Sequence, residues 1–196
     1  MSSFIKAAFS AFCLTALVTA APTNKPRACT PGFVRTPDMY NLYPQLPDKA
    51  GSAVSEWHIE TFNNKSQLEQ AAVFKNIPAE ATSCSVMWAQ GNRTDRTFLV
   101  DGSDALIRVH QLSGFPAAGT PVSYSSVKPF DTLGDKNPVA VDLTGWDTID
   151  ATTHIGGGID CAAEIRLFLY MEHANGDTKV LLDQDDKNGL YISYKC

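Results

Sequence analysis

Residues 161–171 alternate between two faces, and this pattern limits the fold of the chain more than any other. The apolar face holds Cys161, Ala163, Ile165, Leu167, Leu169 and Met171, and the second face holds Ala162, Glu164, Arg166, Phe168 and Tyr170. Side chains alternate in this way along a β-strand, whereas a helix would mix Glu164 and Arg166 into the apolar face. The segment is therefore predicted to be a long strand that turns one face toward the core.

Short runs with the same period of two, bounded by turn residues, fill most of the chain after residue 54. They lie at residues 54–62, 70–77, 84–88, 97–100, 105–112, 139–143, 180–182 and 190–194. Roughly eight to ten short strands separated by turns are typical of an all-β fold. We therefore expect an antiparallel β-sandwich tied by disulfides, with a jelly-roll or barrel-like closure as the nearest alternative.

Residues 21–53 are predicted to form an extended, Pro-rich lead-in, because they contain six prolines. Proline has no backbone N–H to donate and is confined to the edges and ends of sheets. We expect this lead-in to reach the fold near Phe33 or Val54. Residues 155–159, with three consecutive glycines, predict a flexible connection or a bulge. No long linker divides the rest, so residues 54–196 are predicted to form one β-sandwich domain.

Residues 1–20 predict a cleavable secretory signal. Lys6 is followed by an apolar stretch, and small residues precede a cleavage site expected between Ala20 and Ala21. The apolar run is shorter than the about 20 residues that a membrane-spanning helix needs, so a membrane span is not expected. The formal net charge is −5 and the sequence has no basic cluster, which argues against nucleic-acid binding.

The chain has five cysteines, of which Cys13 would leave with the signal. The remaining four, in an oxidising compartment, predict two disulfides, and their wide spacing disfavours a zinc site. They allow three connectivities. We prefer Cys29–Cys196, which would tie both chain ends to the body of the protein, together with Cys84–Cys161, which would join two strands.

Two N-glycosylation sequons fit a secreted protein. They begin at Asn64 and Asn92, and each lies in a polar stretch between apolar runs. The alternative for each is an unused match, since the three-residue pattern is common.

Three landmarks resemble the fungal "ubiquitin 3 binding protein But-two C-terminal domain" family. Residues 74–78 followed by Cys84 resemble its F-x-x-I-P … C block, and residues 189–196 resemble its G-L-Y-x-x-Y-x-C terminus. Cys161 before a long alternating strand fits the third landmark. The resemblance covers most of the chain after about residue 54.

The resemblance implies a small secreted fungal protein, outside the cell or at the cell wall. The family is named for a member that binds a ubiquitin-like activating enzyme inside the cell, a partner that a secreted chain would not meet. The family offers no catalytic motif that matches this sequence residue by residue. An intracellular role beside such an enzyme is the weakest of the functions considered.

The sequence shows no local catalytic or metal-binding motif. No G-x-S-x-G element is present, and the histidines are too scattered for a local metal pair, so no cofactor or metal is expected. Carboxylates could form a glycosidase-like pair, with candidates Glu56, Glu60, Glu164, Glu172, Asp142, Asp147 and Asp150. Asp183, Asp185 and Asp186 could hold calcium, although a solvated turn is the preferred interpretation.

Trp146, between Gly145 and Asp147, is the candidate for a ligand contact, because an exposed aromatic ring can stack on a sugar. A half-buried loop anchor is the alternative for this residue. We therefore expect a non-catalytic secreted protein that binds a cell-wall polysaccharide or a host protein. The alternative is a carbohydrate-active enzyme with a carboxylate pair, and the sequence does not decide the oligomeric state.

Overall fold

The computed structural model describes residues 29–132, 139–174 and 176–196. The predicted signal peptide, with its cleavage site after Ala20, lies outside the described residues. In the described part of the chain, no helix is both long enough and apolar enough to cross a membrane.

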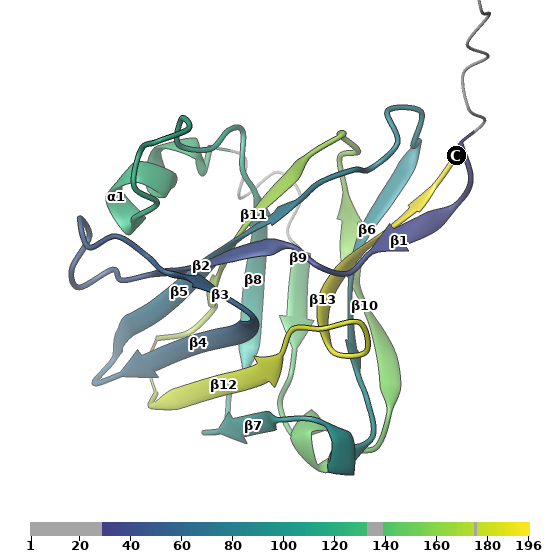
Figure 1. The fold of residues 1–196 in the computed structure, drawn as a ribbon. Coiled ribbons are helices and arrows are strands. Elements are labelled where there is room, and N and C mark those ends of the chain that lie inside the picture. The colour runs from purple at the N-terminus through teal and green to yellow at the C-terminus, as the bar shows by residue number, and fades with distance from the viewer. Residues whose placement is uncertain (1–28, 133–138, 175) are drawn as a thin grey trace, which may run out of the picture.

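Two antiparallel β-sheets make up the fold (Figure 1). The smaller sheet has four strands, in the order β1 (Gly32–Val34), β13 (Gly189–Lys195), β6 (Ser83–Gln90) and β10 (Thr152–Ile159). Tyr191 of β13 lies opposite Met87 of β6, and Ile155 of β10 lies opposite Met87 on the other side. Strand β6 is thus central in this sheet.

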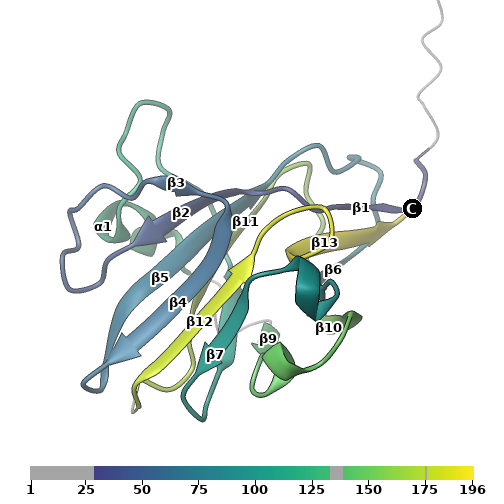
Figure 2. The same ribbon diagram turned by 60° about the horizontal axis from the view of Figure 1, so that its bottom comes forward.

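The larger sheet has nine strands. Its main path runs β7 (Phe98–Asp101), β12 (Thr178–Asp183), β4 (Glu56–Phe62), β5 (Lys65–Phe74), β11 (Ile165–Met171), β8 (Leu106–Gln111) and β9 (Val139–Asp142). Strand β2 (Asp38–Leu42) pairs with β5, and β3 (Ala53–Val54) pairs with β2. Figure 2 shows β5, β4, β12 and β7 side by side. The predicted all-β sandwich is confirmed.

The main core lies between the two sheets, where the alternating apolar faces meet. Trp57 of β4 and Trp88 of β6 are among its largest fully buried side chains. Ile165, Leu167 and Leu169 of β11 point into the same cluster, as their spacing predicts. Burying each such side chain stabilises the fold by about 1.5–3 kcal/mol, so this core is the main source of stability.

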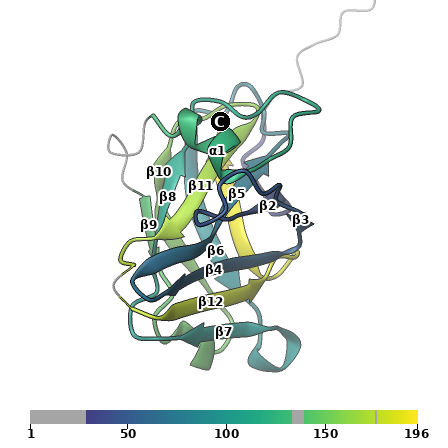
Figure 3. The same cartoon turned by 90° about the vertical axis from the view of Figure 1, so that its left-hand side faces the viewer.

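A second apolar cluster covers the outer face of the larger sheet. The short helix α1 (Tyr124–Val127) and the 3₁₀ turn Lys128–Phe130 follow β8 and lie over β5 and β11 (Figure 3). Ser123 caps the helix, since its hydroxyl accepts a hydrogen bond from the Ser126 N–H. Phe168 is therefore buried although it lies on the opposite face of β11 from the main core.

Both disulfides are present in the preferred pairing. Cys29 and Cys196 have Cα atoms 5.7 Å apart, and the bond holds the segment before β1 against the end of β13. Cys84 and Cys161, with Cα atoms 5.2 Å apart, join β6 to the segment that follows β10. The preferred connectivity of the cysteines is thus confirmed.

The Pro-rich segment 21–53 is more ordered, over its described residues, than the sequence indicates. It contributes β1, which pairs with β13, and β2, which pairs with β5. The prolines flank these strands instead of interrupting them: Pro31 stands before Gly32, and Pro37 before Asp38. A proline just before a strand removes no hydrogen bond from its ladder, which explains the difference.

Two further segments differ from their predicted form. Residues 155–159 belong to strand β10, with a bulge between Ile155 and Gly157. A Cβ at Gly156 would lie 2.7 Å from Val141 Cγ1, so glycine permits a close approach there. Strand β11 begins at Ile165 and not at Cys161, because Cys161 is bonded to the smaller sheet and the chain must cross to the larger one first.

Candidate functional site

The outer face of the four-stranded sheet carries aromatic, aliphatic and charged side chains. Because Val86 and Trp88 point into the core, Met87 and Ala89 point outward. Register places Tyr191 beside Met87, and the Phe33 and Tyr191 rings meet edge to face with centroids 6.2 Å apart. The Phe33 side chain is 61 % exposed, which makes it an apolar surface available to a ligand.

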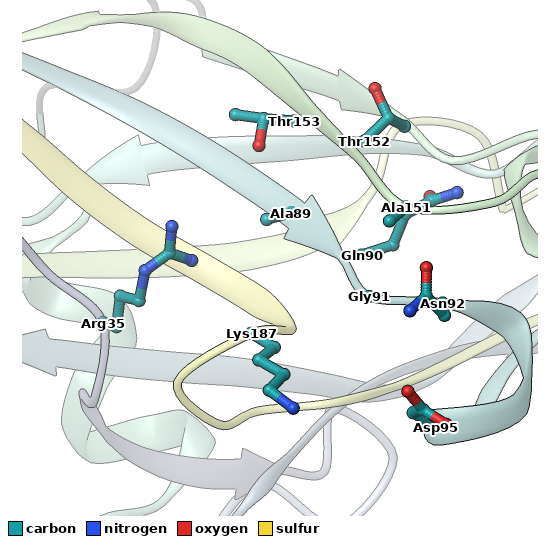
Figure 4. Close-up of a pocket in the computed structure, with 10 residues that line it drawn as sticks. All are labelled: Arg35, Ala89, Gln90, Gly91, Asn92, Asp95, Ala151, Thr152, Thr153 and Lys187. Atoms are coloured by element: carbon teal, nitrogen blue, oxygen red, sulfur yellow. The ribbon is translucent and has the colours of Figure 1, made fainter.

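A pocket of about 410 Å³ opens beside this apolar surface (Figure 4). It lies where β6 ends and β10 begins, between the segment after β1 and the turn before β13. Its lining consists of Arg35, Ala89, Gln90, Gly91, Asn92, Asp95, Ala151, Thr152, Thr153 and Lys187. The lining combines hydroxyl, amide and charged groups with the apolar side chains of Ala89 and Ala151.

Arg35 is held in place by the aromatic rings of the sheet. Its guanidinium carbon lies 4.1 Å from the Tyr191 ring centroid and 4.9 Å from that of Phe33. Cation–π contacts of this kind contribute roughly 0.5–1 kcal/mol at exposed sites. The guanidinium has no hydrogen-bond or ion-pair partner within the described residues, so its donors are available to a ligand.

Lys187 projects from a tightly braced turn between β12 and β13. The Asp185 carboxylate accepts hydrogen bonds from the backbone N–H groups of Lys187 (2.7 Å) and Asn188 (2.8 Å). Burial opposes ionisation of Asp185, but the bonds from the Asn188 side chain and these backbone groups outweigh it and lower the pKa of Asp185. Asn188 Oδ1 in turn accepts from the Gly91 N–H at 2.7 Å, which fixes the turn against the end of β6.

Two of the three aspartates considered for calcium have structural partners in this region, and Asp186 is exposed. Asp185 braces the turn, and Asp183 Oδ2 accepts a hydrogen bond from the Thr97 N–H. Among the described residues, no group of three or more His, Cys, Asp or Glu side chains is arranged to hold a metal ion.

Trp146, the residue predicted as a ligand contact, lies in a 3₁₀ turn (Trp146–Thr148) and does not line this pocket. Its half-buried ring packs edge-on against Trp88, with centroids 6.3 Å apart, and against His154 at 4.2 Å. The Gln90 side chain holds the same turn by donating to the carbonyls of Trp146, Ile149 and Asp150. These contacts fit a half-buried residue that anchors a loop better than an exposed ring on which a sugar could stack.

The two sequon asparagines are exposed in different surroundings. Asn64 lies in the turn between β4 and β5 with φ of 56°, a left-handed conformation that asparagine tolerates. Asn92 lies at the rim of the pocket. Both side chains are accessible to modification, and a glycan on Asn92 would stand at the pocket entrance.

The candidate catalytic carboxylates are mostly engaged with neighbouring groups. Glu60 lies 3.1 Å from His58, Glu164 accepts from Arg166 at 2.7 Å, and Glu172 is paired with Arg108. Two of the candidate aspartates accept hydrogen bonds from backbone N–H groups, Asp142 from Thr144 and Asp147 from Val100.

A buried polar cluster on the larger sheet has no counterpart in the sequence predictions. His110 Nδ1 lies 2.9 Å from Asp131 Oδ1, its Nε2 lies 3.0 Å from the Tyr170 hydroxyl, and Lys128 donates to Asp131 at 2.8 Å. Burial raises the pKa of nearby Glu69 to about 7, although a hydrogen bond from Ser66 and the charge of Lys128 act to lower it. The predicted strand began at residue 70, which left Glu69 out of the alternating pattern.

A second groove, of about 420 Å³, lies between β2, β5 and the loop before α1. Tyr40 and Phe115 form one wall, with ring centroids 5.9 Å apart. The charged groups at its other side are Asp38, Lys75 and Glu164, and Lys75 is bonded to Asp38 at 2.6 Å. The charge of Lys75 is therefore already paired with a carboxylate, unlike the charges of Arg35 and Lys187 in the first pocket.

A comparison with models of known protein families gave no match, and a comparison with curated proteins gave none either.

Proposed function

We propose that the protein is a secreted, non-catalytic polysaccharide-binding protein of a filamentous fungus, related to the But-two C-terminal domain family. The ligand would lie on the outer face of the four-stranded sheet, over Phe33 and into the adjacent pocket. The two disulfides support secretion, because such bonds persist in oxidising compartments. The cell wall or a host surface is the location that this function implies.

The single observation that carries the proposal is the junction of an exposed aromatic ring with a polar pocket. Phe33 offers an apolar surface on which a sugar ring can stack, and sugar rings present C–H groups on one face. Asn92, Thr152 and Thr153 offer amide and hydroxyl groups to the sugar hydroxyls. Binding sites usually combine an apolar surface with a few polar groups that fix orientation, as here.

The same pocket offers little to a hydrolytic mechanism. A glycosidase needs two carboxyl groups on opposite sides of the bond that it cleaves. Asp95 is the one carboxylate among the ten residues that line this pocket. The arrangement therefore favours binding over catalysis at this site.

A pull-down experiment on insoluble polysaccharides tests the proposal. The protein is incubated with chitin, β-glucan and de-esterified pectin gel, and the retained fraction is compared among variants. Phe33→Ala should weaken binding about fivefold, since it removes the stacking surface. Phe62→Ala is the matched control, because that ring is 51 % exposed but belongs to β4 of the other sheet.

Trp146→Ala separates this site from the one that the sequence suggested. Retention of this variant should equal that of the unaltered protein wherever both are folded, as judged by circular dichroism. No retention on any of the three polysaccharides would overturn the proposed function. Equal losses for Phe33→Ala and Phe62→Ala would overturn its location.

Secretion has a separate test. Expression of the full chain in a filamentous fungus should place the protein in the medium or wall fraction, with Ala21 as its first residue. An intracellular pool that begins at Met1 would contradict the proposal.

A further inference from the structure

We infer that the pocket between Arg35 and Lys187 binds a carboxylate group, so that the ligand is an acidic polysaccharide built from uronic acids. This inference rests on the proposed function and names its substrate class. It follows from the charges of the lining residues, from the unpaired hydrogen-bond donors of Arg35 and Lys187, and from the order of the polar groups along the pocket.

The pocket concentrates positive charge in a chain that is negative as a whole. The formal net charge of the chain is −5, yet Arg35 and Lys187 face the single carboxylate Asp95 in this lining. Asp95 is partly satisfied, since it accepts a hydrogen bond from the Thr94 hydroxyl at 2.9 Å. The lining residues themselves thus carry one excess positive charge, and Lys187 also interacts electrostatically with Asp185 outside the lining.

Both cations keep their donors free. Arg166, Lys75 and Lys128 each have a carboxylate partner within 2.8 Å. Arg35 and Lys187 have no carboxylate within ion-pair distance among the described residues. Free donors on a concave surface are what a ligand anion needs, because charge-assisted hydrogen bonds are the strongest that it can form.

The guanidinium is also oriented in advance. Its contact with the faces of Tyr191 and Phe33 restricts the plane of the Arg35 fork before any ligand arrives. A planar fork matches the two oxygens of a carboxylate, whereas a lysine ammonium acts as a point charge. Arg35 is thus suited to bind the carboxylate itself, and Lys187 to add an electrostatic contribution.

The order of groups along the pocket sets the direction of the ligand. In Figure 4, Arg35 lies at one end, Asn92 and Asp95 lie at the other, and Lys187 extends between them. The carboxylate of a uronic acid would lie at the Arg35 end, close to the Phe33 ring. Its neighbouring hydroxyls would then reach Asn92 and Asp95, which can donate to and accept from them.

The test is a titration calorimetry series on protein made in the bacterial periplasm, where disulfides form and Asn92 stays unmodified. The probes are oligogalacturonate, its methyl ester, a sulfated oligosaccharide and a neutral β-glucan oligosaccharide of similar length. Oligogalacturonate should bind at least tenfold more tightly than the methyl ester, which keeps the hydroxyls and removes the charge. It should also bind more tightly than the sulfated probe.

The variants assign the charge to particular residues. Arg35→Gln should weaken binding of oligogalacturonate about ten- to a hundredfold, since it removes a charge-assisted pair. Arg35→Lys should recover only part of that loss, and Lys187→Gln should produce a smaller one. Lys65→Gln is the matched control, because it removes an exposed positive charge at the start of β5, in the other sheet. It should leave affinity unchanged.

Each outcome bears on one of the two proposals. Equal affinity for the acid and its methyl ester, or equal effects of Arg35→Gln and Lys65→Gln, would overturn this inference. Tighter binding of the sulfated probe would overturn the assignment of a carboxylate. Binding of the neutral probe that depends on Phe33 but not on Arg35 would overturn the inference and leave the proposed function standing. Binding of none of the probes would overturn both.

Discussion

Asn188 and Gly91 are joined by a 2.7 Å hydrogen bond that connects the turn before β13 to the end of β6. The Asn188 side chain accepts from the Gly91 N–H through Oδ1 and donates to the Asp185 carboxylate through Nδ2. Asn188 is only 2 % exposed, so the Gly91 N–H and the Asp185 carboxylate could not replace its hydrogen bonds with bonds to water if the side chain were removed. One buried amide thus sets the position of Lys187 relative to Asn92 across the pocket.

Asn188→Ala should therefore lower the free energy of unfolding by about 1–3 kcal/mol, because it leaves buried polar groups unpaired. Urea denaturation followed by tryptophan fluorescence measures the change. The same variant should bind polysaccharide more weakly, since the turn that carries Lys187 loses its brace. Unfolding and binding indistinguishable from those of the unaltered protein would show that the bond does not organise the pocket.

The Cys84–Cys161 disulfide should be required for stability. It closes a loop of 77 residues in sequence and holds β6 to the chain segment that crosses to the larger sheet. Replacement of both cysteines with alanine should cost about 2–5 kcal/mol, chiefly by freeing the unfolded chain. Thermal unfolding with and without reductant checks this. A melting temperature of the variant equal to that of the oxidised protein would contradict it.

Glu69 should make the protein less stable as pH rises from about 4.5 to about 7. Burial raises the pKa of this carboxyl from 4.5 to about 7, so the folded state keeps a proton that the unfolded state loses in that interval. The contribution of protonated Glu69 to the free energy of unfolding is complete below pH 4.5 and is lost as pH rises through about 7. By the linkage relation the loss is roughly 3 kcal/mol.

Glu69→Gln isolates this effect, because glutamine does not ionise. Between pH 4.5 and pH 7.5 the variant should lose about 3 kcal/mol less of its unfolding free energy than the unaltered protein. The comparison also removes the opposite contribution of His154, whose pKa is lowered by burial. The same pH dependence in both proteins would exclude Glu69 as its source.

Both sequons should carry glycans when the protein is secreted from a eukaryotic host, and only the one on Asn92 should affect binding. Asn92 lines the pocket, whereas Asn64 lies in the turn between β4 and β5. Thr94→Ala removes the sequon at Asn92 and keeps the asparagine itself. Asn64→Asp removes the other sequon, and aspartate tolerates the left-handed backbone at that position.

Mass spectrometry of the secreted protein measures occupancy, and pull-down measures retention. Thr94→Ala should increase retention on polysaccharide, and Asn64→Asp should leave it unchanged. Unmodified asparagine at both positions would refute the glycosylation prediction, and equal retention of glycosylated and Thr94→Ala proteins would show that Asn92 does not guard the site.

Much of the fold could be predicted because its cause is local. The period of two in β11 follows from one face meeting the core, and it is visible in the order of Ile165, Leu167 and Leu169. The cysteine pairing followed from a similar physical argument about chain ends and strand faces. The strands of the Pro-rich lead-in are harder to predict, because the proline content of a segment is the same whether its prolines flank a strand or prevent one.

The candidate pocket could not be predicted because its cause is not local. Arg35, Asn92, Thr153 and Lys187 come from four distant parts of the chain, and β-pairing alone brings them together. Asn92 belongs to a sequon, which indicates a glycan and not a pocket, and the other three belong to no recognisable motif. An aromatic residue after a strand, such as Trp146, favours a ligand contact on sequence alone. Its contacts with Trp88 and His154 depend on how β6 and β10 pair.

The most direct test of the central proposal is a map of the amide groups that a ligand perturbs. Oligogalacturonate is titrated into isotopically labelled protein, and backbone amide shifts are followed by NMR. The largest changes should cluster on β1, β6, β10, β13 and the segments that adjoin them, with Arg35, Asn92 and Lys187 among them. Changes that cluster around Trp146 or on the larger sheet, with the four-stranded sheet unaffected, would contradict the account.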